Sequence, residues 1–553
     1  MRFSLKITKL RNSPKVRISD ETERQKMNWQ KTISIEELNS SNSHVFKQGS
    51  KQIALLKDGE KIFACDNRCP HEGYPLSQGT TDGKCFLTCN WHNWKFNLEN
   101  GDCVIGGDNL RVYETKVEDE FLWVNLAEPS KEEITESILK GLKQAFEKRE
   151  TGRISRELAR LHYNEIPMTL GLKKAIEWSF DKFEYGTTHA YAASADWLSL
   201  YFENQENLEN QIICLSEAID HIAFDSLRHK TYPFVEKKQK FDYEKLVQAV
   251  EEENESEAIS YIRGGLESGM HFKDFEKALT ETALKHYNDF GHSLIYVYKV
   301  GTLIELLGEE VEKPLLLSLV RSICYATRED LIPEFSYFGE CLKKCNFSGE
   351  KSIVPLNSDE VFKKNVNNAM DWVVKKSSNS SEEQIYNALL ESNAISMLKF
   401  DTSYQFAYDK PVGDNISWLG FTHSLTFANA VRVQCKKFPE FWKFGLLQMA
   451  CFSGRNIRYL DLEVSENDWE VGNLENFFIK SFNQILDHGN GLPIFSAHLI
   501  KTAFAVREEL EFSTESGKKY LLASLNRFLN SPLKQKHIRR TVRQGIGLVS
   551  KDF

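Results

Sequence analysis

The spacing of hydrophobic and polar positions changes once along this chain. Up to about residue 126, short runs bounded by turn residues predict strands, and from Lys131 onward leucine, glutamate and lysine recur at helical spacing. The composition shifts at residues 127–130. We therefore expect a multidomain protein, with a small all-β domain over residues 28–127, a large mostly α-helical domain over residues 128–553 and a basic extension over residues 1–27.

The strand and helix runs can be placed individually. An Asp58-Gly59 turn between two of the strand runs indicates a hairpin. Two polar stretches, 346–359 and 377–383, predict surface loops, and a division of the helical domain into halves near 346–383 is one option. The predicted strands are residues 43–46, 52–57, 61–65, 86–89, 95–96 and 121–124, and the clearest helical runs are residues 244–251, 275–307 and 421–452.

Composition excludes several classes of protein. The net charge of −9 argues against a nucleic-acid partner, and eleven cysteines in 553 residues fit a reducing, cytoplasmic location better than a disulfide framework. The most apolar window, 293–307, is broken by Lys299 and Glu305, so we expect no membrane partner. The first 26 residues carry eight Lys/Arg against three acids and no apolar core, as in a flexible extension.

One pair of motifs carries specific chemistry. Cys69-Pro70-His71 is followed, after 17 residues, by Cys89-Asn90-Trp91-His92. Two thiolates and two imidazoles in this order are what a Rieske [2Fe–2S] cluster requires, with two cysteines on one iron and two histidines on the other. A closed tetrahedral zinc site is the alternative for the same four residues.

The flanking residues favour the cluster. Residues 71–79, His-Glu-Gly-Tyr-Pro-Leu-Ser-Gln-Gly, resemble the ligand loop of soluble Rieske ferredoxins and Rieske oxygenases. The resemblance implies a [2Fe–2S] cofactor bound by Cys69, His71, Cys89 and His92. It also implies turns at Gly73, Pro75 and Gly79, with Trp91 and Trp94 as apolar cover. The loops lack the extra cysteines of respiratory Rieske proteins, so we interpret Cys65, Cys85 and Cys103 as free thiols.

Four histidines in the helical region occupy similar positions. Residues 290–294 and 421–425 share four of five residues around His292 and His423, and His189 and His498 also follow small residues near the start of helical runs. We predict four helices that each present a histidine inward, although a histidine buried for packing is the alternative at each position. Positions three, four and seven further on share the histidine's face. They are Ala192, Ala193 and Asp196 for His189; Ile295, Tyr296 and Lys299 for His292; and Thr426, Phe427 and Ala430 for His423.

A Rieske cluster stores one electron, and in enzymes it supplies a second centre, commonly an iron held by two histidines and a carboxylate. The nearest local candidate is Asp225-x₃-His229 with His221 and Glu217. Asp289-x-x-His292 is half of a di-iron motif without a visible partner.

The helical part also looks like a second family. Residues 289–296, 421–426 and 428–432 resemble the histidine-bearing helices of questin oxidase-like proteins, which are associated with oxidative cleavage of polycyclic aromatic ketones. The resemblance implies that His189, His292, His423 and His498 line a pocket, as ligands of a second, non-haem iron or as acid/base groups.

We therefore expect a Rieske oxidoreductase that passes electrons to a helical domain, which oxidises an apolar organic substrate with oxygen in a monooxygenase-like reaction. The chain has no dinucleotide-binding motif, so a separate reductase or ferredoxin would donate the electrons. A homo-oligomer is one option, because in multi-subunit Rieske oxygenases one subunit's cluster serves its neighbour. The alternative is a Rieske electron-transfer protein fused to a non-catalytic interaction or redox-sensing domain. Convergence of the four histidines would favour the enzyme.

Overall fold

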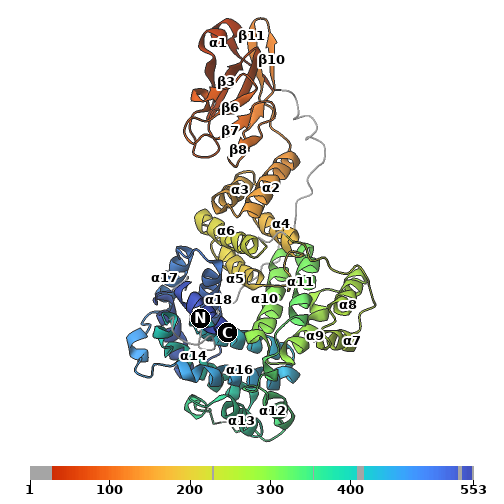
Figure 1. Ribbon diagram of the computed structural model, residues 1–553, viewed down its shortest axis with the longest axis vertical. Coiled ribbons are helices and arrows are strands. Elements are labelled where there is room, and N and C mark those ends of the chain that lie inside the picture. Colours follow the sequence, from red (N-terminus) through yellow and green to blue (C-terminus); the bar gives the residue numbers. More distant parts are fainter. Residues whose placement is uncertain (1–27, 227–229, 353, 408–415, 534–537, 551–553) are drawn as a thin grey trace. The chain divides into compact units, whose positions relative to one another are not determined.

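The computed structural model describes residues 28–226, 230–352, 354–407, 416–533 and 538–550. The chain forms two compact units, Met1–Gly141 and Leu142–Phe553, and each is described by itself. All strands of the described part lie in the first unit, and the second is helical (Figure 1). The expected fold class, a small all-β domain followed by a large helical region, is confirmed.

The first unit contains eleven strands among the described residues. They form three antiparallel sheets with the orders β1-β11-β10, β2-β3-β4-β9 and β5-β6-β7-β8. The bounds are β1 Trp29–Ser34, β2 Ser43–Gln48, β3 Lys51–Asp58, β4 Lys61–Asp66, β5 Thr80–Thr81, β6 Phe86–Thr88, β7 Lys95–Asn97, β8 Cys103–Ile105, β9 Val112–Tyr113, β10 Thr115–Glu118 and β11 Phe121–Asn125, with one helix, α1 Ile35–Ser41.

All six predicted strands are confirmed to within two residues at each end. The hairpin is confirmed too, since Asp58 pairs with Lys61 across the turn and Gly59 has a φ of 63°. The sequence pattern does not predict β1, β5, β8, β9 or β10. Two of these, β5 and β9, are two residues long, which is too short for an alternating pattern to be visible.

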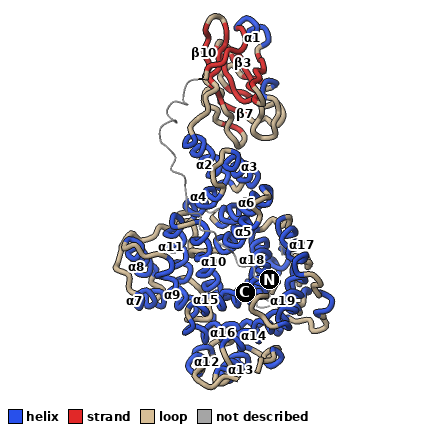
Figure 2. The backbone as a smooth tube through the Cα atoms, turned by 180° about the vertical axis from the view of Figure 1, so that it is seen from behind, coloured by secondary structure: helices blue, strands red, loops and turns tan. Residues whose placement is uncertain are grey.

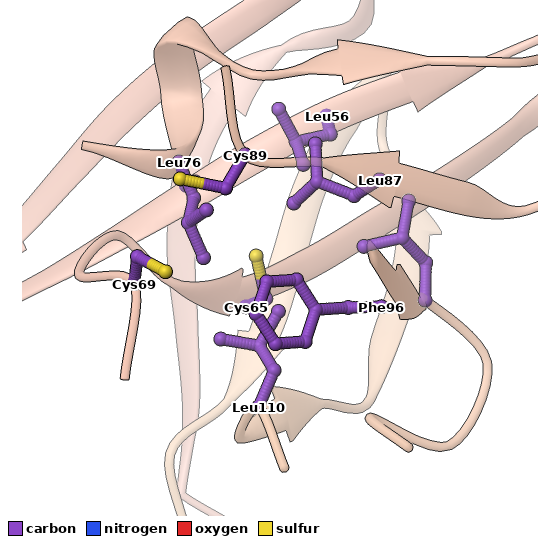
Figure 3. Packing of buried hydrophobic residues seen from close by; sticks show 10 residues of the cluster. Leu56, Cys65, Cys69, Leu76, Leu87, Cys89, Phe96 and Leu110 are labelled. Atoms are coloured by element: carbon purple, nitrogen blue, oxygen red, sulfur yellow. The ribbon is translucent and has the colours of Figure 1, made fainter. Parts of the chain in front are cut away.

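Two loops leave this β scaffold and approach each other. One follows β4 and the other joins β6 to β7. The cysteine at the start of each loop belongs to one buried cluster with Leu76, Leu87 and Phe96, as Figure 3 shows. The first residue of each loop is therefore anchored in the apolar core of the β unit.

The second unit contains nearly all helices of the described chain (Figure 2). Their bounds, with α2 spanning the boundary between the units, are α2 Lys131–Lys148, α3 Thr151–Tyr163, α4 Thr169–Ser179, α5 His189–Glu203, α6 Leu208–Asp225, α7 Tyr243–Glu251, α8 Glu255–Glu267, α9 Phe272–Leu284, α10 His292–Leu307, α11 Glu312–Cys324, α12 Phe338–Lys344, α13 Val366–Ser377, α14 Glu382–Leu398, α15 Trp418–Lys437, α16 Trp442–Asn456, α17 Leu474–Leu486, α18 Pro493–Glu509, α19 Glu515–Leu529 and α20 Ile538–Val549.

Two of the predicted helical runs are divided in the structure. The run over 275–307 breaks between α9 and α10, where Phe290 and Gly291 both have left-handed backbone angles (φ 51° and 77°). The run over 421–452 breaks at Pro439, which has no N–H to continue the hydrogen-bond ladder. A periodicity of apolar residues continues through such breaks because both flanking helices bury a face.

Four helices form a closed arrangement in which each packs on the next: α5 on α10, α10 on α15, α15 on α18 and α18 on α5. Figure 2 labels all four next to one another. Gly291 lets α10 begin close to α15, because a Cβ at this position would lie 2.4 Å from the Phe427 ring. The four histidines predicted from the sequence lie on these four helices.

Candidate metal centres

The two loops of the β unit have the same backbone fold. In each, the cysteine N–H donates to the carbonyl five residues later, Tyr74 O at 2.9 Å for Cys69 and Trp94 O at 2.7 Å for Cys89. The fourth residue after each cysteine, Gly73 or Asn93, donates back to the cysteine carbonyl and has a left-handed φ (79° and 62°). Glycine and asparagine tolerate this conformation best, so the local sequence explains both turns.

The loops bring two thiols and two imidazoles together. Cys69 and Cys89 are buried, and the rings of His71 and His92 lie 4.6 Å apart, centroid to centroid. The Nε2 atoms of both histidines face the exposed carboxylate of Glu72, at 3.9 and 3.7 Å. His71 Nδ1, in contrast, is buried and has no hydrogen-bond partner among the described residues.

This donor set fits a cluster held by sulfur and imidazole nitrogen. An orphaned, buried ring nitrogen is costly unless it binds something, and a metal ion would satisfy it. Burial raises the pKa of Cys69 to about 11, while the backbone N–H groups of His71 and Glu72, which hydrogen-bond to its sulfur, act in the opposite direction. A bound cation offsets the cost of holding thiolates in this buried position. Cys65, Cys85 and Cys103 are in no disulfide among the described residues, as predicted.

The two tryptophans predicted as apolar cover both contact a ligand histidine, but in different ways. Trp94 stacks on the His71 ring, with centroids 4.5 Å apart and an interplanar angle of 13°. Trp91 is 63% exposed; it stacks on Tyr74 and meets the His92 ring edge-on, with centroids 5.5 Å apart, so it contacts a ligand ring while most of its own surface faces water. The spacing of the motif cannot show which of the two side chains turns toward the core.

Gly106 has no side chain, and the Trp94 ring occupies the space next to its Cα. A Cβ on Gly106 would lie 2.4 Å from the Trp94 ring, and the φ of Gly106 is 129°. We expect Gly106→Ala to destabilise the β unit by about 1–3 kcal/mol, because both the backbone and the tryptophan must shift. Thermal unfolding measures the loss, and a displaced Trp94 would also alter the visible circular dichroism of the cluster. Gly83→Ala is the control, since Gly83 also has a positive φ (76°) but nothing lies within 4 Å of its added Cβ; equal losses in both variants would contradict the role of the Trp94 contact.

The match to a known family decides what this unit is. The family model described as "Rieske [2Fe-2S] domain" matches residues 28–113. The chain also covers 74% of the 3-phenylpropionate/cinnamic acid dioxygenase ferredoxin subunit of Photorhabdus laumondii, with 30% identity over 78 residues, or 14% of this chain. Residues 28–113 belong to the Rieske [2Fe–2S] family. A [2Fe–2S] cluster and electron transfer are therefore what this domain implies.

Other relatives share the Rieske domain alone. The 4β-methylsterol monooxygenase of Methylococcus capsulatus is 30% identical over 92 residues, which are 14% of this chain and 25% of that protein. The chain spans a quarter or less of the length of the first curated relatives that it matches. A solved complex of reduced oxygenase and oxidized ferredoxin in carbazole 1,9a-dioxygenase aligns with 23% identity and a TM-score of 0.17, over 18% of this chain and 96% of that one.

None of these matches supports the resemblance of the helical region to questin oxidase-like proteins. That resemblance stays a prediction. No helix among the described residues is long and apolar enough to cross a membrane.

In the helical unit the four predicted histidines converge. His292 Nε2 lies 3.0 Å from His189 Nε2, which lies 3.5 Å from His423 Nε2, which in turn lies 3.2 Å from His498 Nε2. His292, His423 and His498 are buried, and His189 is half-buried. His189 and His292 begin their helices, as expected, whereas His423 and His498 lie more than one turn inside α15 and α18.

Backbone contacts fix the protons of two of these rings. His498 Nδ1 lies 2.6 Å from the carbonyl of Ile494, and His423 hydrogen-bonds to the carbonyl of Leu419, also four residues earlier. A carbonyl only accepts, so each ring donates its N–H there and its Nε2 carries a lone pair. The two Nε2 atoms thus face each other at 3.2 Å as acceptors. This arrangement is unfavourable unless a cation lies between them.

A shared proton is a poor candidate for that cation. Burial lowers the pKa of His189, His423 and His498 well below the usual value, and the neighbouring Lys501 and the other imidazoles act in the same direction. A metal ion binds neutral imidazoles and has no such penalty. Candidate ligand atoms of His189, His423 and His498 lie within 4.8 Å of one another.

Three charged residues lie buried beside the histidines, and the sequence pattern does not predict their contacts. Lys299 Nζ lies 2.7 Å from Asp196 Oδ1, one heptad after His292 and His189 respectively, and this buried ion pair ties α10 to α5. Lys501 is buried three residues after His498, and its Nζ has no hydrogen-bond partner in the described part of the chain. Burial lowers the pKa of Lys501 to about 7. Lys501 is three positions after His498, so the rule that such positions share a helix face would have indicated it.

The alternative triad is not assembled in the described residues. His221 Nε2 lies 3.7 Å from Asp225 Oδ2, and Asp225 also accepts from Thr188. Glu217 instead contacts His488, at 3.1 Å, and Ser496. His229 lies outside the described residues, and so does the side chain of Asp289.

Proposed function

We propose that this chain is a Rieske oxidoreductase whose helical unit oxidises an apolar organic substrate with oxygen at a second metal centre. The observation that carries the proposal is the convergence of four imidazoles from four helices, two of which face each other with lone pairs at 3.2 Å. Electron transfer by the Rieske domain needs an acceptor, and buried imidazoles are a donor type that suits iron among other metals, which supports the proposal.

In this proposal Cys69, His71, Cys89 and His92 hold the [2Fe–2S] cluster. The free Nδ1 of His71, the two buried sulfurs and the paired loops support the assignment. Trp94 keeps water away from one face of His71, and the Glu72 carboxylate lies 3.9 and 3.7 Å from the outer Nε2 atoms of His71 and His92, as a nearby negative charge. The cluster, when bound, supplies one electron at a time at a potential above that of all-cysteine ferredoxins.

In this proposal His189, His423 and His498 hold the second metal ion, because their candidate ligand atoms all lie within 4.8 Å of one another, and His292 adjoins the set through His189. Metal–imidazole bonds of about 2.0–2.1 Å put neighbouring donor nitrogens about 2.9–3.4 Å apart, depending on coordination geometry. The three Nε2 separations, 3.0, 3.2 and 3.5 Å, are close to that range. An acceptor of electrons must be redox-active, which excludes zinc and favours iron. Unlike the common two-histidine-one-carboxylate site, this set consists of imidazoles.

The surrounding residues have separate tasks in the proposal. The carbonyls of Leu419 and Ile494 orient the rings of His423 and His498. Each carbonyl also keeps the ring proton on the nitrogen that points away from the other imidazoles. Tyr296 Oη, 3.4 Å from His189 Nδ1, does the same for His189. Lys501 holds or releases a proton at Nζ near neutral pH, because its pKa is about 7. A separate reductase or ferredoxin supplies the electrons, as the Rieske resemblance implies.

Iron analysis of the anaerobically purified full chain tests the second centre. We expect more iron than the two atoms of the cluster, with the excess lost in His423→Ala/His498→Ala and retained in His162→Ala, an exposed histidine of the same unit. The low-average-g signal of the dithionite-reduced cluster should be the same in all three proteins. In stopped-flow mixing with oxygen, the reduced cluster should be reoxidised more slowly in the double variant.

Two results would contradict the proposal. Iron that stays at two atoms per chain, together with no other transition metal, would leave the four histidines as a packing feature. Reoxidation that is equally fast in the wild type and the double variant would show that electrons leave the Rieske domain without the helical unit. Either outcome favours the alternative of an electron-transfer domain fused to a non-catalytic helical partner.

A further inference from the structure

A half-buried histidine outside the candidate metal sites bridges two carboxylates. His286 lies between α9 and α10, and its side chain is 18% exposed. Its Nδ1 lies 2.8 Å from Asp330 Oδ2, and its Nε2 lies 2.8 Å from Glu251 Oε1. Asp330 belongs to the 3₁₀ turn η4 (Glu329–Leu331), and Glu251 is the last residue of α7. One imidazole therefore ties three separate segments together.

The two contacts determine the charge of the ring. A carboxylate only accepts hydrogen bonds, so both ring nitrogens of His286 must carry a proton for both contacts to be favourable. A neutral imidazole keeps a lone pair on one nitrogen, and that lone pair would face a carboxylate oxygen at 2.8 Å. The hydrogen bonds with Asp330 and Glu251 raise the pKa of His286 above its usual value, although partial burial acts in the opposite direction. The ring is therefore held as an imidazolium.

The other charged groups near this site act unequally on the two carboxylates. Lys285 Nζ lies 3.2 Å from Glu251 Oε2, so Glu251 keeps a cationic partner when the ring loses its proton. Asp330 depends more on the ring, because its Oδ1 is buried and has no hydrogen-bond partner in the described chain. The remaining charged groups that face this site from η4, the turn after α7 and α16 are Arg328, Glu329, Glu253 and Arg455.

The segment that His286 holds leads directly into α10. Residues 285–291 join α9 to α10, and His292 is the first residue of α10. The N–H groups of Glu329 and Asp330 both donate to the carbonyl of Tyr287, at 2.9 and 3.2 Å. The turn η4 is thus a support for the connection from which α10 begins. A weaker hold on Asp330 would loosen that support.

We propose that His286 is a pH-sensitive latch that, in its protonated form, clamps η4 and the end of α7 on the connection before α10. When the ring loses its proton, one of its two hydrogen bonds becomes a contact between a lone pair and a carboxylate, and the connection loosens. The latch uses none of the four converging histidines, so it is independent of the proposed oxidation.

The direction of the pH dependence follows from the raised pKa of His286. An unfolded chain titrates its histidines near pH 6.5, as a rough value. The latch therefore stabilises the helical unit fully below about pH 6.5, and this stabilisation is lost as the pH rises through the higher pKa of the folded state.

Titration of His286 in the full-length holoprotein tests the latch directly. Deuterium exchange of the imidazole Cε1 hydrogen, followed by mass spectrometry at a series of pH values, gives the pKa of each histidine in its own peptide. We expect His286 to titrate at a higher pH than His162, which is an exposed histidine of the same unit. Asp330→Asn should lower the pH at which His286 titrates, because it removes one of the two carboxylates. A His286 that titrates at or below the pH of His162 would overturn the proposal.

Thermal unfolding of His286→Gln tests the consequence for stability. Glutamine is neutral, so we expect the wild type to unfold at a higher temperature than the variant below about pH 6.5, with a difference that shrinks as the pH is raised toward about 9. His162→Gln is the matched control and should follow the wild type at every pH. A difference between the wild type and His286→Gln that does not change with pH would show that the ring contributes packing and no charge, which contradicts the latch.

Discussion

Replacing Cys89 with alanine will remove the [2Fe–2S] cluster from the Rieske domain. The side chain is buried at the start of the second ligand loop, and alanine provides no thiolate for the iron. We expect the loss of the visible absorption and of the reduced EPR signal, and iron lower by two atoms per chain. The β unit should also lose stability, because ligand binding to the folded state contributes directly to folding.

The control for this variant is Cys85→Ala. Cys85 is a half-buried free thiol of the same unit and belongs to neither ligand loop. It should keep the full cluster spectrum. A cluster that survives in Cys89→Ala would mean that another group, and not Cys89, binds the iron, whereas loss in both variants would point to unfolding. Iron bound by the helical unit should remain in Cys89→Ala, which separates the two centres.

Asp196→Ala will destabilise the helical unit by about 3–5 kcal/mol, which is the usual cost of leaving one member of a buried ion pair without its partner. Asp196 and Lys299 are both nearly inaccessible to water, and their charged atoms are 2.7 Å apart. Burial raises the pKa of Asp196 to about 6. Burial lowers the pKa of Lys299, but the Asp196 carboxylate and the other neighbouring groups together raise it by more, so the net shift is upward. Both groups are therefore charged at pH 7. Urea unfolding of the helical transition measures the loss.

The double variant Asp196→Ala/Lys299→Met separates charge from packing. It removes both charges and keeps an apolar chain of similar length in place of lysine, so we expect it to recover most of the lost stability. A double variant as unstable as Asp196→Ala would show that the loss comes from packing and not from the unpaired ammonium. Metal retention by the four histidines should follow the same order, because the pair fixes α5 against α10 near His189 and His292.

The local parts of the structure could be predicted from the sequence. Six of the eleven strands in the described part, the hairpin at Asp58-Gly59 and the ligand loops depend on residues a few positions apart, and their spacing is visible in the chain. The similar positions of His292 and His423 also indicated a shared role. The structure brings all four histidines together, and what they bind stays a prediction.

Contacts between distant residues decided the rest. The histidine pairs are separated by 75 to 234 positions, so their Nε2 distances depend on how four helices pack, which no local pattern records. The same holds for the ion pair of Asp196 with Lys299 and for the exposed position of Trp91. Helical periodicity shows which residues share a face, but α20, in which Ile538 and Val542 are exposed and Arg540 is buried, demonstrates that it does not show which face turns inward. The sequence by itself therefore determined the two-part fold class, the Rieske ligand motif and the candidate histidines. Only the tertiary structure decided which side chains meet and which face water, because those depend on non-local packing.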